Sequence, residues 1–157
     1  MNKATAALIL VPTRELAYQV SKVVTALAAY CHDDVRHVNL MQKVSQDTQR
    51  SMLSSRPDIV ICTPARAIEN ISSDNLGVQN LTQLIIDEAD LVLSYGHDND
   101  LKRLSDNIPF GVQKIFTSAT LSRDVHAIKD MLCESPVLVE LDDGKDDTKG
   151  LSQYYVR

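Results

Sequence analysis

The sequence predicts an α/β protein with a parallel sheet that helices cover on both faces. Short apolar runs alternate with amphipathic segments along almost the whole 157-residue chain. Strands that alternate with helices of this length form βαβ units, and such units build parallel sheets. The length suits one domain with a core of its own. The hydrophobic fraction of 44% and the charged fraction of 24% are those of a globular protein, not a disordered one.

The first half of the chain predicts three strands and three helices. Residues 6–11 are a continuous apolar run that stops at Pro12, as expected for a strand buried on both faces. Thr13 is the expected N-cap of the next helix. The apolar face of that helix consists of Leu16, Val20, Val23, Val24 and Leu27. The other predicted elements are a strand over 35–41, a polar helix over 44–53, a strand over 58–62 and a helix from about residue 64.

The second half predicts further strands over 84–86 and 112–117. A helix is predicted after residue 121, and a short strand over 137–139 follows Pro136. The apolar residues of that helix are Val125, Ile128, Met131 and Leu132. Residues 142–150 are acidic and contain glycine, which is typical of a linker. We therefore expect residues 1–141 to belong to one domain and residues 142–157 to begin a linker toward another.

Polar segments directly follow four of the predicted strands. In sheets of this kind, ligands bind at the carboxyl ends of the strands, so these segments are the candidate site. They are Pro12-Thr13-Arg14, Thr63-Pro64-Ala65-Arg66, Asp87-Glu88 and Ser118-Ala119-Thr120.

Asp87 and Glu88 are adjacent carboxylates at the end of the apolar run 84–86. In nucleotide hydrolases, a carboxylate at such a position holds Mg²⁺ through its water shell, and a neighbouring one orients and deprotonates the attacking water. Alternatively, the two residues are the N-cap and first-turn Glu of the next helix, which the helix dipole favours. Both interpretations remain open on these two residues alone.

Ser118 and Thr120 stand about thirty residues after Asp87, at the end of the next predicted strand. Small hydroxyl residues at a strand-to-helix turn are most often capping groups. If the two strands are adjacent, these hydroxyls can instead bond Asp90 and link the nucleotide site to whatever moves on hydrolysis.

Residues 12–14 and 63–66 each place a Thr, a Pro and an Arg at the start of a helix. Free backbone N–H groups, a hydroxyl and a guanidinium together make a surface that binds phosphate. Such contacts hold a sugar-phosphate backbone without reading bases. The alternative for either segment alone is helix capping, with the Arg side chain exposed to solvent.

Taken together and in this order, the four segments resemble the DEAD-box RNA helicases. Residues 12–17 match the family's Pro-Thr-Arg-Glu-Leu-Ala motif, residues 87–90 its name-giving motif and residues 118–120 its Ser-Ala-Thr motif. The resemblance covers essentially the whole chain. It implies the first RecA-like domain of a P-loop NTPase-type enzyme that uses ATP and Mg²⁺ and acts on RNA.

The resemblance also implies a role for each matching residue. Asp87 would bind Mg²⁺ through water, and Glu88 would activate the attacking water. Asp90, Ser118 and Thr120 would couple ATP to RNA. The RNA phosphates would be held by the residues at the two helix starts, which are Pro12, Thr13, Arg14, Thr63, Pro64 and Arg66.

Three positions depart from the family's pattern. Ala65 replaces the glycine of Thr-Pro-Gly-Arg, which implies a modest local change because Ala tolerates most backbone geometries except positive φ. The paired glycines expected near residues 40–43 are absent, and residues 94–97 keep only the glycine of the usual Met-Gly-Phe pattern. In these features the sequence resembles the nucleolar branch of the family, which assists assembly of the large ribosomal subunit. That resemblance implies pre-ribosomal RNA as a partner and a nuclear or nucleolar location.

The largest departure concerns the phosphate-binding loop G-x-x-x-x-G-K-[ST]. The only Gly-Lys pair is Gly144-Lys145, which precedes Asp146, and the position five before Gly144 is Val139. The resemblance places the missing loop before Met1, and it also implies a second RecA-like domain, with arginine fingers, in the same protein. We therefore expect the chain alone to be inactive. The alternatives are a non-catalytic remnant that binds RNA or a protein, and an unrelated α/β enzyme that uses Asp87 and Glu88 on a small molecule.

Charge, cysteines and hydropathy limit the other possibilities. A net charge of −5 excludes RNA binding by bulk electrostatics, so any RNA site must be local or completed by another domain. Cys31, Cys62 and Cys133 are odd in number and far apart, which predicts buried thiols in a reducing compartment. No apolar run is long enough to cross a bilayer, and residues 1–4 do not begin a secretion signal. We therefore expect an intracellular protein without membrane partners.

Overall fold

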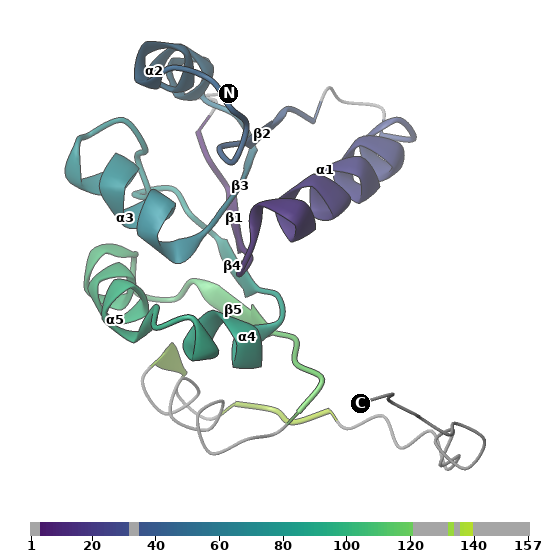
Figure 1. Cartoon of the computed structure of the whole chain (residues 1–157), viewed down its shortest axis with the longest axis vertical. Coiled ribbons are helices and arrows are strands. Elements are labelled where there is room, and N and C mark those ends of the chain that lie inside the picture. The colour runs from purple at the N-terminus through teal and green to yellow at the C-terminus, as the bar shows by residue number, and fades with distance from the viewer. Residues whose placement is uncertain (1–3, 32–34, 121–131, 134–135, 140–157) are drawn as a thin grey trace, which may run out of the picture.

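The computed structural model describes residues 4–31, 35–120, 132–133 and 136–139. Five strands form one sheet in the order β2-β3-β1-β4-β5, and every neighbouring pair is parallel (Figure 1). The strands are β1 (Ala7–Leu10), β2 (His37–Asn39), β3 (Ile59–Cys62), β4 (Gln83–Ile86) and β5 (Gln113–Phe116). This arrangement confirms the predicted parallel α/β fold, with helices on both faces of the sheet.

One face of the sheet is covered by α1 (Arg14–Ala28), which contacts β2 and β3. Ala17 of this helix is buried together with Val11 and Ile61 in a small core of its own. The main core lies on the other face, and the remaining helices contribute buried side chains to it. They are α2 (Gln46–Ser54), α3 (Pro64–Ser72), α4 (Ala89–Ser94) and α5 (Asp98–Asn107).

The two faces of the sheet differ in how well they are covered. On the main-core face of β4, Leu84 and Ile86 are fully buried. On the α1 face, an isoleucine row runs across the sheet in register through Ile61, Ile9, Ile85 and Ile115. Its exposure rises from 0% at Ile61 to 40% at Ile115, because α1 lies over β2 and β3 and leaves β4 and β5 uncovered within the described residues.

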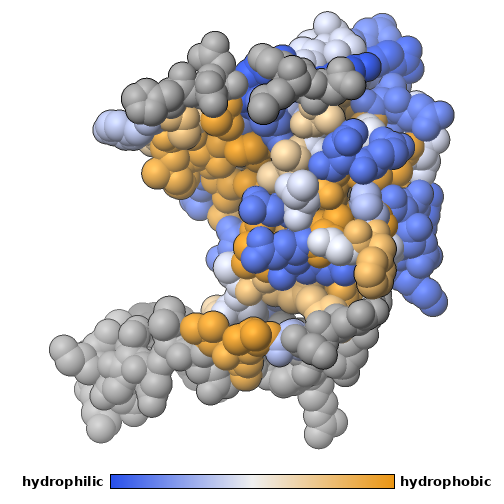
Figure 2. Space-filling view, turned by 180° about the vertical axis from the view of Figure 1, so that it is seen from behind, coloured by the Kyte–Doolittle hydropathy of each residue, from blue (hydrophilic) through white to orange (hydrophobic). Residues whose placement is uncertain are grey.

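The helix α1 also presents apolar side chains to solvent. Val23 and Leu27 are 57% and 66% exposed, and apolar surface gathers over this helix in the view from behind (Figure 2). Ser21 and Thr25 of the same helix lie within hydrogen-bond distance of His37 in β2. The helix therefore packs toward β2 on one flank, while its other flank is apolar and open.

The structure agrees with the predicted elements to within a few residues at their ends, with two exceptions. The helices α4 and α5 were not predicted, and the strand predicted over 137–139 is wrong. Residues 137–139 are in no strand, and their side chains are 90%, 61% and 76% exposed. A strand needs a neighbour to satisfy its backbone, and among the described residues no strand pairs with this segment.

Several other expectations fall at the margins of the described residues. The helix predicted after residue 121 lies mostly outside them, although Leu132 is helical and buried in the main core. The predicted linker, residues 142–157, lies outside them entirely. The prediction of three buried thiols is confirmed for Cys62 only: Cys133 is half-buried, and Cys31 is exposed because it follows the end of α1. Among the described residues, no helix has the length and apolar character that a membrane crossing requires.

Candidate functional site

The four candidate segments lie along one edge of the sheet. They follow β3, β1, β4 and β5, which are consecutive neighbours in the sheet order. Because all of these strands are parallel, their carboxyl ends meet at the same edge. The topology therefore brings together the segments that begin at Thr63, Pro12, Asp87 and Ser118.

The two carboxylates occupy the turn between β4 and α4, but they do not cap the helix. The backbone N–H of Asp87 donates to the carbonyl oxygen of Leu10 at 2.9 Å, which ties this turn to β1. Glu88 stands at the N-cap position with φ 54° and ψ 52°, in the left-handed region, and its side chain makes no capping bond. The alternative of simple capping therefore does not describe these side chains.

The sequence argument missed Thr117, which contacts both carboxylate residues. Its hydroxyl donates to Oδ1 of Asp87 at 2.5 Å, and the N–H of Glu88 lies 3.4 Å from the same hydroxyl oxygen. The pairing of Ile86 with Phe116 places the next residue of each strand, Asp87 and Thr117, side by side. This register was the signal for Thr117, but it could be used only once β4 and β5 were known to be neighbours.

Asp90 contacts the Ser-Ala-Thr segment through one of the two predicted hydroxyls. Oγ1 of Thr120 donates to Oδ2 of Asp90 at 2.9 Å, and the N–H of Leu91 donates to the other carboxylate oxygen at 3.0 Å. Partial burial acts to raise the pKa of Asp90, but these hydrogen bonds outweigh it and hold the pKa below its usual value. The Ser118 hydroxyl also acts to lower the pKa of Asp90, while its own short hydrogen bonds are to the backbone carbonyl and N–H of Thr120.

The threonines of segments 12–14 and 63–66, called here the two Thr-Pro-Arg segments after the residue types they share, both cap helices. Oγ1 of Thr13 accepts a hydrogen bond from the Leu16 N–H at 3.2 Å, and Oγ1 of Thr63 accepts one from the Arg66 N–H at 3.4 Å. A hydroxyl has one proton to donate as well as lone pairs to accept with. Each threonine can therefore cap its helix and still donate to an anion at the helix start.

The two prolines and Arg14 of these segments also lie at the starts of the two helices. Pro12 links β1 to the cap, and Arg14 is the first residue of α1. Pro64 opens α3 at its first position, where its fixed φ favours the helix. Neither segment contains a lysine. A phosphate at either helix start would therefore bind an arginine guanidinium, which can form two parallel hydrogen bonds.

Arg66 already has a carboxylate partner. Its Nη1 lies 2.6 Å from Oε2 of Glu69, one turn further along α3, in a partly exposed ion pair. An anion that binds Arg66 would have to share the guanidinium with Glu69 or displace it. The neighbouring Cys62 is fully buried, and this burial raises the pKa of its thiol to about 12 although Arg66 acts in the opposite direction. Cys62 is therefore a neutral core residue and not a nucleophile.

The departures from the helicase pattern produce little strain. Ala65 lies inside α3, and among the described residues positive φ occurs outside glycine only at Arg56, Asp74 and Glu88. Ala65 therefore has a helical backbone and is not strained by the replacement of glycine. In the turn after β2, the buried Asn39 accepts a hydrogen bond from the Met41 N–H, where the family has glycines.

The acidic residues at this edge suit a Mg²⁺ ion that arrives with phosphates. Among the described residues there is no group of three His, Cys, Asp or Glu side chains that could hold a metal ion by themselves. Mg²⁺ commonly keeps several waters and is bound through one or two carboxylates together with the phosphates of a substrate. Asp87, with Oδ1 bonded to Thr117, fits that pattern of ligation.

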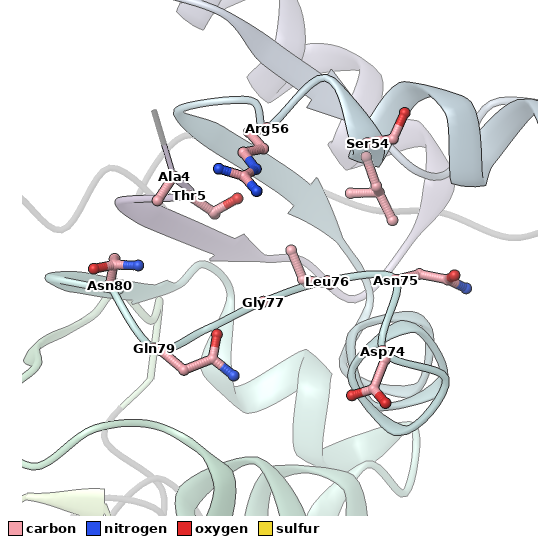
Figure 3. A pocket seen from close by; sticks show the side chains of 11 residues that line it. Ala4, Thr5, Ser54, Arg56, Asp74, Asn75, Leu76, Gly77, Gln79 and Asn80 are labelled. Atoms are coloured by element: carbon pink, nitrogen blue, oxygen red, sulfur yellow. The ribbon is translucent and has the colours of Figure 1, made fainter. Parts of the chain in front are cut away.

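A polar pocket of about 530 Å³ lies at the opposite edge of the sheet (Figure 3). It is formed by Ala4 and Thr5 before β1, by residues near Arg56 before β3, and by residues 74–77 and 79–80 before β4. The side chains of Arg56 and Asp74 at this pocket are exposed. None of the predicted site residues lines it. It is therefore separate from the candidate site.

Comparison with known proteins gives one consistent result. The family model described as DEAD/DEAH box helicase matches residues 1–128. Over 155 residues the chain is 57% identical to a protein of Aspergillus niger named ATP-dependent RNA helicase dbp9, covering 99% of this chain and 25% of that protein. The Coccidioides immitis protein named ATP-dependent RNA helicase DBP9 is 50% identical over 156 residues, covering 99% of this chain and 26% of that protein. The chain thus spans about a quarter of the length of these curated relatives.

Two solved structures have the same fold. A DEAD box protein from the hyperthermophile Methanococcus jannaschii matches with a TM-score of 0.76 at 24% identity, covering 85% of this chain and 36% of that one. The S. cerevisiae dbp5 L327V variant, bound to gle1 H337R and IP6, matches with a TM-score of 0.79 at 20% identity, covering 90% of this chain and 35% of that one. At this level of identity, the likeness concerns the fold alone.

Proposed function

Since this chain belongs to the DEAD/DEAH box helicase family, we propose that it forms part of the catalytic core of an ATP-dependent RNA helicase. Such an enzyme couples ATP hydrolysis to the remodelling of RNA duplexes or RNA–protein complexes. The observation that carries the proposal is the carboxyl edge of β4 and β5, where Asp87 and Glu88 are free of capping and Asp90 is bonded to Thr120. The names of the relatives from Aspergillus niger and Coccidioides immitis support the same activity.

In this proposal the carboxylates of Asp87 and Glu88 have different roles in ATP hydrolysis. Asp87 holds Mg²⁺ through its water shell, and Glu88 orients the attacking water and takes its proton. When bound, Mg²⁺ neutralises charge that develops on the phosphates. Glu88 can point its carboxylate into the nucleotide edge because its side chain is not used to cap α4.

The RNA backbone would lie across the starts of α1 and α3. There the hydroxyls of Thr13 and Thr63 retain a proton to donate, and Arg14 and Arg66 supply guanidinium groups. Pro12 and Pro64 shape these two turns. The protein as a whole is acidic, with a net charge of −5, so we propose that RNA is held by these few local donors together with another domain.

Asp90 and the Ser-Ala-Thr segment would link the two activities. The Thr120–Asp90 hydrogen bond joins the segment after β5 to the first turn of α4, directly beside the catalytic carboxylates. Ser118 supports it by fixing the backbone of Thr120. A change in the position of Asp90 on hydrolysis would therefore reach the segment after β5.

We propose that residues 1–141 are the later part of a first RecA-like domain and that residues 142–157 lead toward a second. The phosphate-binding loop, which the sequence lacks, would come from another part of the same protein. The departures at Ala65, at residues 40–43 and at residues 94–97 support the nucleolar branch of the family. On that basis we propose pre-ribosomal RNA as the partner and the nucleus or nucleolus as the location.

The missing G-x-x-x-x-G-K-[ST] motif also favours a second candidate function, a non-catalytic module that binds RNA or a protein with the same fold. The two candidates differ in whether Glu88 has a catalytic task. In a full-length protein that carries this chain, the Glu88→Gln variant is expected to lose ATP turnover by at least about 100-fold while retaining ATP-dependent RNA binding. RNA-stimulated phosphate release and RNA binding with and without ATP are the measurements.

A matched control is Asp106→Asn, which removes an exposed carboxylate from α5 but leaves Asp87, Glu88 and the proposed RNA contacts unchanged. It is expected to retain ATP turnover. If Glu88→Gln turned over ATP at the wild-type rate, Glu88 would not be the base, and if the wild type itself were inactive, the non-catalytic module would be favoured.

A further inference from the structure

Thr117, the first residue after β5, connects to both ends of the turn that carries the two carboxylates. Its backbone N–H donates to the carbonyl oxygen of Ile86 at 3.0 Å, and its own carbonyl oxygen accepts from the N–H of Ala89 at 2.9 Å. Ile86 and Ala89 are the residues on either side of Asp87 and Glu88. The main chain of Thr117 therefore fixes where this turn begins and where it ends.

The side chain of Thr117 connects to the middle of the same turn. Its hydroxyl donates to Oδ1 of Asp87 at 2.5 Å and lies 3.4 Å from the N–H of Glu88. An ionised carboxylate can only accept, so the hydroxyl proton must point at Asp87, and its lone pairs remain to receive the Glu88 N–H. One hydroxyl thus contacts both residues that the proposed mechanism requires.

We propose that Thr117 is a positioning residue that sets the orientation of the Asp87 carboxylate and the backbone of Glu88. The inference rests on the proposed function, in which Asp87 holds the water shell of Mg²⁺ and Glu88 activates water. With Oδ1 bonded to Thr117, the rotation of the Asp87 side chain is restricted, and Oδ2 is not used in that hydrogen bond. Threonine suits this task because its branched Cβ limits the side chain to few rotamers, so the hydroxyl is held in place.

The backbone of Glu88 gives the second reason. Its φ of 54° is left-handed, a conformation that residues other than glycine adopt at a cost and keep only where neighbouring contacts hold it. Thr117 supplies two such contacts. Its hydroxyl oxygen accepts from the Glu88 N–H, and its carbonyl oxygen accepts from the Ala89 N–H. The direction of the Glu88 side chain depends on this conformation.

A substitution at Thr117 can remove the contacts of its hydroxyl but not those of its backbone. Thr117 is exposed, so its replacement creates no cavity in the core, and its backbone hydrogen bonds do not depend on the side chain. Thr117→Val keeps the branched shape without the hydroxyl, Thr117→Ala removes both, and Thr117→Ser keeps the hydroxyl. All three variants are therefore expected to fold, which thermal melts would check.

The test measures two properties of the full-length protein as a function of free Mg²⁺: equilibrium binding of a fluorescent, non-hydrolysable ATP analogue, and RNA-stimulated ATPase activity at saturating ATP. Thr117→Val and Thr117→Ala are expected to raise the Mg²⁺ concentration for half-maximal binding and for half-maximal rate and to lower kcat, each by about 2- to 10-fold, the range for loss of one hydrogen bond. Thr117→Ser is expected to restore both values to within about twofold. A role limited to holding the strand end would not change the Mg²⁺ dependence.

The matched control is Thr82→Val. Thr82 is also an exposed threonine next to a strand, and its hydroxyl bonds the carbonyl oxygen of Ala6 at the opposite edge of the sheet. Its loss is expected to leave the Mg²⁺ dependence unchanged. A wild-type Mg²⁺ response and kcat in any folded variant without the Thr117 hydroxyl would overturn the inference while the proposed function stands. A wild-type protein without RNA-stimulated ATPase activity would instead overturn the proposed function.

Discussion

At the scale of single residues, Asp90 offers a direct measurement of the link between β5 and α4. Its pKa is lowered because hydrogen bonds from Thr120 and the Leu91 N–H favour the ionised carboxylate more than partial burial opposes it. A carboxyl whose pKa is lower in the folded than in the unfolded protein stabilises the fold above its unfolded pKa, which is about 3.9. That stabilisation is lost as the pH falls through the folded pKa.

The Thr120→Val variant is therefore expected to raise the pKa of Asp90 toward its usual value. Its free energy of unfolding should lie below that of the wild type at neutral pH, and the difference should disappear at a pH below the folded pKa. An NMR titration of the Asp90 carboxyl carbon and urea unfolding at several pH values are the measurements. Thr120→Ser, which keeps the hydroxyl, is the control, and equal Asp90 titrations in wild type and Thr120→Val would contradict the prediction.

The sequence was enough to select the candidate segments and one contact between them, Thr120 with Asp90, but not the other contacts. Residue type and position after an apolar run were enough to select Asp87, Asp90 and the two Thr-Pro-Arg segments. The partner of each depended on strand order, which periodicity does not reveal. For that reason Thr117 was missed, and the ion pair of Arg66 with Glu69 was not expected.

At the scale of elements, Thr13 combines two tasks that substitution can separate. Its hydroxyl accepts the Leu16 N–H to cap α1, and its proton is free to contact RNA phosphate in the proposed function. Thr13→Ala is expected to lower the free energy of unfolding by about 1 kcal/mol, the usual effect of losing an N-cap, and also to weaken RNA binding. Thr13→Asp should retain the cap, since Asp is a good N-cap residue, but should repel phosphate.

Urea unfolding and RNA affinity are the two measurements for these variants, and Thr13→Ser, which preserves both tasks, is the control. The prediction requires that stability and RNA affinity separate in Thr13→Asp, with stability near that of the wild type and RNA affinity reduced. If Thr13→Asp bound RNA as tightly as the wild type, the start of α1 would not contact the RNA backbone.

The failure to predict α5 and the wrong strand over 137–139 each have a physical cause. The helix α5 is polar almost throughout, and only Leu101 and Leu104 are buried, so its apolar periodicity is too weak to detect. The opposite error occurred at residues 137–139, where a Val-Leu-Val run has strand propensity but no neighbouring strand among the described residues. Propensity is local, whereas a strand exists only through its partner.

At the scale of the whole molecule, one face of the sheet is only partly covered within the described residues. The isoleucine row becomes progressively exposed toward β5, and β5 is the last strand of the described sheet. The open flank of α1, with Val23 and Leu27, borders the same face. An apolar sheet face and an apolar helix flank of this kind are normally buried by further secondary structure.

The 157-residue chain alone is expected to bind Mg²⁺·ATP weakly or not at all. Asp87 and Glu88 can position a metal ion and a water molecule, but a triphosphate is held mainly by the backbone N–H groups and Lys of a phosphate-binding loop, which this sequence does not contain. Titration of the chain with a fluorescent ATP analogue, with a full-length protein as the positive control, measures this directly. Low-micromolar affinity in the chain alone would mean that the edge of β4 and β5 binds phosphates without such a loop. In that case Asp87→Asn should abolish the binding, because the carboxylate would be the main remaining anchor for the metal ion.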